Sequence, residues 1–214
     1  FMESVWWGFK QIYDKGLVYE GRKVLLYCPR CETPISNFEV AMDNSYKEVT
    51  EEAVTVKFKL KVGQKIGDWE VPENTFVLAW TTTPWTLPTN FALAVGPKIE
   101  YAVVAGHLLA KSVVGAHAKE LGFETGDEAV AAIERTVMGE ALAGLRYQRI
   151  FDFYADQSKF DVANAWQVLV DDYVGEGDGT GIVHQAPAYG EDDQRVCEAA
   201  GIPVYVSINE RGEF

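Results

Sequence analysis

The segment 80–90, with the sequence WTTTPWTLPTN, constrains the fold of this chain more than any other. It follows the apolar run FVLA at 76–79, and an apolar run bounded by turn residues is typical of a buried strand. Pro84 restricts Thr83 to an extended backbone, so the threonines are held in place. The pattern predicts a strand that leaves the core and presents threonine hydroxyls to a pocket. A β-branched strand end followed by a proline-rich turn, without any function, has the same pattern.

A second segment, 177–193, has the sequence GDGTGIVHQAPAYGEDD and joins a glycine-rich turn, a short apolar strand, a histidine and an acidic helix start. Together, WTTTPWTLPTN and GTGIVHQAPAYGEDD resemble the editing domain of isoleucyl-tRNA synthetases, the connective-peptide insertion of that class I aminoacyl-tRNA synthetase family. The related valyl and leucyl enzymes usually carry Thr-Thr-Arg-Pro at the first site, whereas this chain carries Thr-Thr-Thr-Pro-Trp. Residues 1–7 also look like the segment that leads into the insertion, so the resemblance extends over essentially the whole chain.

The sequence pattern predicts an α+β fold, and we expect a compact β-barrel-like editing domain with peripheral helices. We expect residues 1–45 to form a connecting arm with a helix and a Cys-X-X-Cys knuckle, and residues 46–214 to form the editing domain, truncated at its C-terminal side. Helices are expected at 1–20, 108–121 and 192–200, and strands at 23–27, 54–60, 76–81, 91–95, 101–104, within 137–153, and at 167–170 and 181–184.

The resemblance implies proofreading. A hydrophobic pocket rejects a substrate that lacks one methylene only weakly, isoleucine and valine being the standard example, so a second and smaller site hydrolyses valine attached to tRNA(Ile). Hydrolysis of valyl-adenylate is a second activity that the resemblance implies. The expected partners are the aminoacylated 3′ end of tRNA(Ile), its valine moiety and the rest of the synthetase chain. The ATP-binding signatures of class I enzymes, HIGH-like and KMSKS-like, are absent from the sequence. The alternatives are a module that binds the charged 3′ end without catalysis, and a zinc-binding connector.

Asp193 is the candidate anchor for the α-ammonium group of the substrate, because a carboxylate accepts a charge-assisted hydrogen bond. Its alternative role is that of an acidic residue in the first turn of a helix. His184 is the candidate size gate, since a rigid imidazole at a strand end would leave room for valine and exclude the extra methyl group of isoleucine. Its alternative role is that of a hydrogen-bonded core histidine. The resemblance favours the functional interpretation of both residues, and His184 is not assigned as a general base.

The threonines Thr81, Thr82 and Thr83 are the candidates that bind the ester and the terminal ribose and order the attacking water, because a hydroxyl both donates and accepts. None of them needs to be a nucleophile, and the hydrolysis requires no cofactor. The remaining candidates for substrate binding are Asn90, which matches a family position in the same site, and Trp80 and Trp85, which stack on adenine or belong to the core.

Cys28 and Cys31 form a Cys-X-X-Cys knuckle, which is half of a Cys₄ zinc site. Cys197 lies too far along the chain to complete it in a recognised spacing. In this family a second cysteine pair often follows the editing insertion, so zinc is expected only in the full-length enzyme. Two reduced cysteines and a disulfide remain as alternatives.

The formal net charge of −13 argues against strong binding of nucleic acid by this chain alone, because such binding rests on lysine and arginine at the phosphates. We therefore expect that other domains hold the body of the tRNA. No apolar run approaches the length of a membrane span, and no secretory signal is visible. We expect a cytoplasmic protein without a membrane partner.

Overall fold

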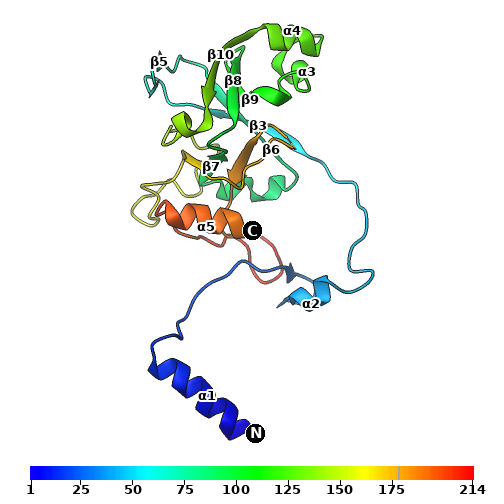
Figure 1. Ribbon diagram of the computed structural model, residues 1–214, viewed down its shortest axis with the longest axis vertical. Helices are drawn as coiled ribbons and strands as arrows, with labels where there is room; N and C mark the ends of the chain where they lie inside the picture. Colours follow the sequence, from blue (N-terminus) through cyan, green and yellow to red (C-terminus); the bar gives the residue numbers. More distant parts are fainter. Residues whose placement is uncertain (178) are drawn as a thin grey trace.

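The computed structural model describes residues 1–177 and 179–214 (Figure 1). Its first 45 residues form an extended arm. The arm contains the helix α1 (Met2–Asp14), the two short strands β1 (Tyr27–Cys28) and β2 (Thr33–Pro34), which pair with each other, and the single-turn helix α2 (Asn37–Val40). The expected strand at 23–27 is thus reduced to β1.

Five strands form the larger sheet of the body. Their order is β10 (Ile133–Met138), β8 (Glu100–Val104), β9 (His107–Ala110), β6 (Phe76–Thr81) and β3 (Val54–Lys59). Strands β6 and β9 pair in parallel, and the other neighbours are antiparallel. The predicted strand over 76–81 is therefore confirmed, and it ends at the first threonine of the TTT segment.

A second sheet has three strands, in the order β11 (Gln167–Val170), β7 (Ala92–Val95) and β12 (Ile182–Gln185). Strand β12 packs against β6 of the larger sheet, and this contact brings the two sequence motifs together. The strands β4 (Lys65–Ile66) and β5 (Trp69–Glu70) form a small hairpin. The α+β class is confirmed, but within the described residues the sheets remain separate and do not close into a barrel.

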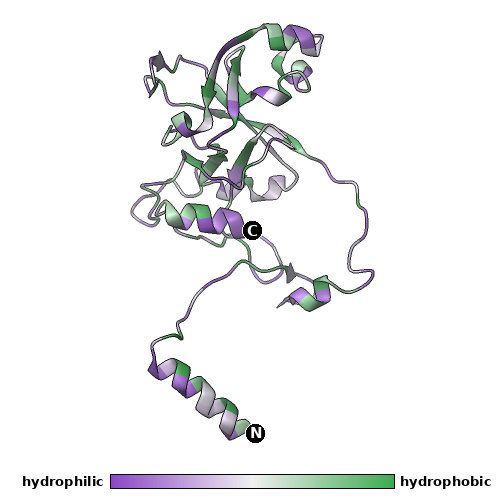
Figure 2. Ribbon diagram, viewed as in Figure 1, coloured by the Kyte–Doolittle hydropathy of each residue, from purple (hydrophilic) through white to green (hydrophobic). Residues whose placement is uncertain are grey.

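The main hydrophobic core lies between the two sheets and is built from the inward faces of their strands. Its largest fully buried side chains include Phe58, Leu93, Leu108, Tyr147 and Ile182. The hydrophobic ribbon segments accordingly gather in the strands of the body (Figure 2). The strands that lead into the two sequence motifs, β6 and β12, thus share one hydrophobic core.

The prediction of a helix over 108–121 is wrong. The structure has β9 there, followed by the 3-10 turn η2 (Lys111–Val113) and the short helix α3 (Ala118–Leu121). Ala105 and Gly106 both have positive φ, 48° and 75°, and two such residues make the tight turn of a β-hairpin. This turn folds β9 back onto β8 and buries its leucines. Gly122, with φ of 90°, ends α3 in the left-handed conformation that glycine favours.

Two further elements complete the body. The helix α4 (Gly126–Ala131) was not predicted, although Thr125 and Glu128 form a capping box at its start. After β10 the chain forms the 3-10 turn η3 (Gly139–Leu142) rather than another strand, and residues further along 137–153 contribute isolated bridges only. The helix α5 (Glu191–Ala199) lies where a helix was expected.

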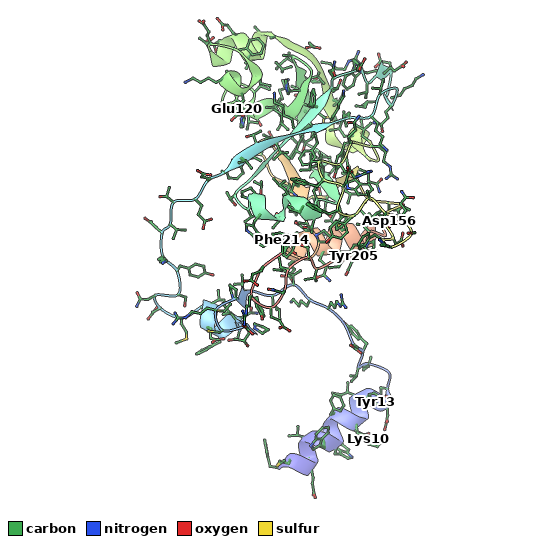
Figure 3. The ribbon with its side chains drawn as sticks, turned by 180° about the vertical axis from the view of Figure 1, so that it is seen from behind. Lys10, Tyr13, Glu120, Asp156, Tyr205 and Phe214 are labelled. Atoms are coloured by element: carbon green, nitrogen blue, oxygen red, sulfur yellow. The ribbon has the colours of Figure 1, made fainter. Side chains whose placement is uncertain are left out.

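The arm contrasts with the body because α1 buries none of its residues within the described structure. Figure 3 shows Lys10 and Tyr13 of α1 apart from the side chains of the body. The arm is attached to α5 further along, where the backbone N–H of Val24 donates to Gln194 Oε1 at 3.2 Å. In the described part of the chain, every helix is too short or too polar to traverse a bilayer.

Candidate functional site

A cavity of about 440 Å³ opens where β6 and β12 end side by side. Two long motifs that are about a hundred residues apart in the sequence meet there because β12 packs against β6. The candidates Trp80, Thr81, Thr82, Thr83, Trp85, His184 and Asp193 all line the cavity, together with Thr86, Gly175, Gly177, Gly179, Thr180, Ile182, Val183, Ala186 and Tyr189.

One side of the cavity, which we call the threonine wall, consists of Thr81, Thr82 and Thr83. Thr81 is 7% exposed, and its Oγ1 accepts a hydrogen bond from the backbone N–H of Thr83 at 3.1 Å. The hydroxyls of Thr81 and Thr83 lie 3.4 Å apart. Thr83 has φ of −123° and ψ of 63°, outside the helical region as its proline neighbour requires, although less extended than predicted. The wall therefore presents hydroxyls on a locally fixed backbone.

The threonine wall is followed by the 3-10 helix η1 (Pro84–Thr89), which begins with a proline at its first position. Thr86 in η1 was not among the candidate residues. Its side chain is buried and contacts two parts of the site: Oγ1 lies 2.8 Å from the backbone oxygen of Thr83 and 2.8 Å from Nε2 of His184. The repeated threonines of the motif were the signal for this residue, but its contact with His184 becomes apparent only in the fold.

His184 lies in β12 with only 6% of its surface exposed. Burial lowers the pKa of its imidazole to about 4, so the ring is neutral at physiological pH. Its Nε2 contacts Thr86, and its Nδ1 lies 3.3 Å from Nδ2 of Asn90. Both ring nitrogens are engaged by the protein, so the imidazole can act as a rigid surface of the cavity.

Asn90 is absent from the described residues that line the cavity. It is 5% exposed and lies behind His184, where Nδ2 donates to the backbone oxygen of Ala92 at 2.9 Å. The hydroxyl of Tyr147 donates to its Oδ1 at 2.7 Å. The structure thus brings Asn90 to the site as a support for the histidine, one layer away from a ligand.

Asp193 lies in the first turn of α5 and is half-buried. Burial raises the pKa of its carboxyl group to about 6, and the backbone N–H of Ala186, which donates to Oδ2 at 2.9 Å, opposes this shift. The negative charge of the neighbouring Asp192 raises the pKa further. At neutral pH the carboxylate is ionised but poorly solvated, and such a group binds an ammonium ion strongly.

Aromatic side chains form the rest of the rim. Trp85 is 48% exposed, and its ring meets that of Tyr189 edge to face at a centroid distance of 5.1 Å. Tyr189 was not among the candidates. Gly179 has φ of 66°, and a Cβ atom there would lie 2.8 Å from the ring of Trp80. The glycine-rich turn is therefore required for the loop to pass this close to the tryptophan.

The cysteine knuckle lies in the arm and not in the cavity. Hydrogen bonds from the backbone and then the side chain of Cys31 lower the pKa of the Cys28 thiol, and the side-chain bond between the two thiols raises the pKa of Cys31. Cys197 is buried in the body. Within 1–177 and 179–214, no three His, Cys, Asp or Glu side chains are placed to share a metal ion. A Cys-X-X-Cys pair supplies two of the four ligands of a Cys₄ zinc site, and zinc binding by Cys28 and Cys31 remains a prediction.

A family model for tRNA synthetases class I (I, L, M and V) matches residues 1–184, which include the threonine wall and His184. The chain belongs to this family. The isoleucine--tRNA ligase of Leifsonia xyli subsp. xyli is 52% identical to it over 100% of the chain, and that of Tropheryma whipplei (strain Twist) is 47% identical over 100% of the chain. The chain spans 21% and 20% of these two relatives, about one fifth of their length.

The fold of this class I synthetase chain is shared with a solved editing domain. The editing domain of the P. knowlesi cytosolic leucyl-tRNA synthetase superposes with a TM-score of 0.51 and 15% identity, and the match covers 71% of this chain and 63% of that one. At this identity the likeness establishes the architecture.

Proposed function

We propose that this chain is the proofreading module of an isoleucine--tRNA ligase and that it hydrolyses the ester of valyl-tRNA(Ile). Its partners would be the aminoacylated 3′ end of tRNA(Ile) and the remainder of the synthetase chain, in the cytoplasm. The relatives that carry the name isoleucine--tRNA ligase and the shared fold of a leucyl-tRNA synthetase editing domain both support this proposal.

One observation carries the proposal: a carboxylate, a neutral imidazole and a cluster of hydroxyls line a single cavity. The Asp193 carboxylate is the only group among the described lining residues that is charged at neutral pH, so it is the natural partner of the α-ammonium group. An amino acid held there places its side chain beside the wall that contains His184. Because that ring is held on both nitrogens, a larger side chain cannot easily displace it.

The proposed chemistry is direct attack by water on the ester carbonyl carbon. The carbon–oxygen bond to the ribose breaks, the ribose oxygen takes a proton, and valine and deacylated tRNA are released. The threonine wall would hold the ester and the terminal ribose and would orient the water. His184 is an unsuitable base, because both of its nitrogens are hydrogen-bonded and its pKa is low. A ribose hydroxyl of the substrate is the proposed aid to proton transfer.

The test measures deacylation of valyl-tRNA(Ile) and of isoleucyl-tRNA(Ile) by the chain at high concentration, because the net charge of −13 disfavours tight binding. We expect the valyl ester to be lost faster than its spontaneous rate and the isoleucyl ester to persist. Valyl-adenylate is assayed in parallel as the second proposed substrate. Equal loss of the two esters, or loss of neither, contradicts the proposal. Tight binding of a non-hydrolysable valyl-adenosine analogue without turnover would instead indicate a binding module.

A further inference from the structure

Tyr147 belongs to neither sequence motif, yet its hydroxyl group reaches into the support of the site. The residue is 1% exposed, and its ring packs edge to face on Phe58 at a centroid distance of 5.3 Å. Its backbone N–H donates to the oxygen of Trp166 at 3.1 Å. Burial raises the pKa of its hydroxyl well above the usual value, so the group stays protonated and can donate. The core thus holds this donor in a fixed position.

The hydrogen bonds of Asn90 determine which way its amide group points. Its Nδ2 donates to the backbone oxygen of Ala92 at 2.9 Å, and its Oδ1 accepts from the Tyr147 hydroxyl at 2.7 Å. The second N–H of the amide is then directed to Nδ1 of His184, 3.3 Å away. An amide N–H can only donate, so Nδ1 must accept through its lone pair.

The other side of the imidazole agrees with this assignment. A neutral imidazole has one N–H, and with Nδ1 unprotonated the hydrogen is on Nε2. Nε2 lies 2.8 Å from Thr86 Oγ1, whose own hydrogen is donated to the backbone oxygen of Thr83 at 2.8 Å. The donors therefore run in one direction from Tyr147 through Asn90, His184 and Thr86 to the threonine wall. We call this series the polar relay.

We propose that Tyr147 is a positioning residue that holds His184, through Asn90, in its Nε2–H tautomer and in one ring orientation. This inference deepens the proposed function, because the orientation of the ring fixes the size of the cavity beside the amino-acid side chain. A relay that ends on a backbone oxygen of the threonine wall also ties the position of the ring to that wall. Specificity then depends on a tyrosine that never contacts the substrate.

Nitrogen-15 NMR of histidine tests the tautomer directly in the 214-residue chain, which contains three histidines. In the wild type we expect Nδ1 of His184 to give the signal of an unprotonated nitrogen and Nε2 that of a protonated one, from pH 8 to pH 5.5. Tyr147→Phe keeps the ring but removes the donor to Asn90. The amide is then held only by the bond from Nδ2 to the backbone oxygen of Ala92, because Oδ1 has lost its donor. We expect its second N–H to hold Nδ1 of His184 less firmly and the second His184 tautomer to appear beside the first.

Tyr101→Phe is the matched control. Tyr101 is fully buried, and its hydroxyl accepts from Gly96 N at 2.9 Å and donates to Gly181 O at 2.7 Å, outside the polar relay. This variant should lose stability in a similar way while the His184 signals keep their wild-type pattern. A single Nε2–H tautomer in Tyr147→Phe, or equal changes in both variants, overturns the proposal.

Asn90→Asp provides a second measurement if Tyr147→Phe does not fold. A carboxylate cannot donate to Nδ1, so we expect Nδ1 of His184 to become protonated, and an Nδ1 that stays unprotonated overturns the proposal.

In Tyr147→Phe we also expect the preference for valyl over isoleucyl ester to fall by about five- to tenfold. If the wild type lacks this preference while the tautomer responds as expected, the proposed function fails and the relay itself stands.

Discussion

The two sides of the cavity differ in their contact with water. The threonine wall is largely solvated, because Thr82 and Thr83 are exposed and only Thr81 is buried. The other side, formed by β12 and the start of α5, carries His184 and Asp193, whose pKa values burial shifts to about 4 and about 6. We call it the buried wall. Under the proposed function, the buried wall would select the amino acid, while the threonine wall would accommodate the ester and the ribose.

This contrast predicts that substitutions in the two walls differ in the size of their effect on activity. A substitution in the buried wall removes an interaction that water cannot replace, whereas a substitution at an exposed hydroxyl removes one that water can partly supply. The loss of valyl-tRNA(Ile) deacylation should therefore be largest for the charged residue of the buried wall and smallest for an exposed hydroxyl of the threonine wall.

Asp193→Asn should have the largest effect, because it removes the charge while it keeps the shape. Loss of one partner of a buried charge pair costs about 2–5 kcal/mol, so kcat/KM should fall by about 30-fold or more. The matched control is Asp192→Asn, since Asp192 is exposed and pairs with Arg195 at 3.0 Å. If both variants lose the same activity, the anchor is not specific to the buried wall.

His184→Ala should open the cavity to isoleucine. Overfilling a packed pocket costs roughly 1–3 kcal/mol, so the ratio of valyl to isoleucyl cleavage should fall by about tenfold or more, with the valyl rate less affected. His107→Ala is the control, because His107 lies in β9 and contacts Lys57 rather than the cavity. A variant that loses both activities together would show that His184 takes part in the chemistry.

The pH profile should follow Asp193. Its pKa is raised to about 6, so the anionic anchor is present above that pH, and kcat/KM should fall by up to about tenfold per unit below it. Acidification affects the free energy of unfolding in the opposite direction: protonation of Asp193 lowers kcat/KM but stabilises the folded chain. A raised folded-state pKa contributes stability that is full below the unfolded value near 3.8 and is lost as the pH rises through about 6. Protonation of Asp193 therefore does not unfold the chain between pH 7 and pH 5. The melting temperature is measured over the same pH range, and an unchanged value shows that the fall in kcat/KM comes from protonation of Asp193 and not from unfolding.

Thr82→Ala should have the smallest effect, because the side chain is exposed. A net hydrogen bond contributes about 0.5–1.5 kcal/mol, so kcat/KM should fall by roughly two- to tenfold. Thr81→Ala is the informative comparison. It also removes the acceptor for the backbone N–H of Thr83, so it should impair the rate more than Thr82→Ala does. The reverse order would mean that the threonine wall acts through its exposed hydroxyl.

The strands that carry the site were predictable because their apolar runs are bounded by clear turn residues, as at 76–81 and 181–184. The segment 108–121 was not, since its leucines and alanines fit a helix as well as a strand. Its conformation was decided by the turn at Ala105 and Gly106, where an alanine adopts the left-handed region. A local conformation of that kind is set by the pairing of β8 with β9 and has no signature in the pattern of apolar residues.

The residues of the cavity were predictable to the extent that they belong to the two motifs. Asn90 was expected to line the site and instead supports His184 from behind, because its amide is held by Ala92 and Tyr147. Tyr147 has no motif of its own, and its contact with Asn90 spans 57 residues of sequence. Such contacts depend on how the sheets pack, which periodicity alone does not determine.

The charge distribution of the cavity has a consequence for the end of the reaction. No lysine or arginine is found among the described residues that line it, and among them Asp193 alone carries a charge at neutral pH. Under the proposed function, Asp193 pairs with the ammonium group of valine, which departs from the nucleic acid when the ester bond breaks. The deacylated 3′ end of the tRNA then makes no ionic interaction with the described residues that line the cavity, and the net charge of −13 disfavours its phosphates. Product release would follow from hydrolysis without a separate conformational step.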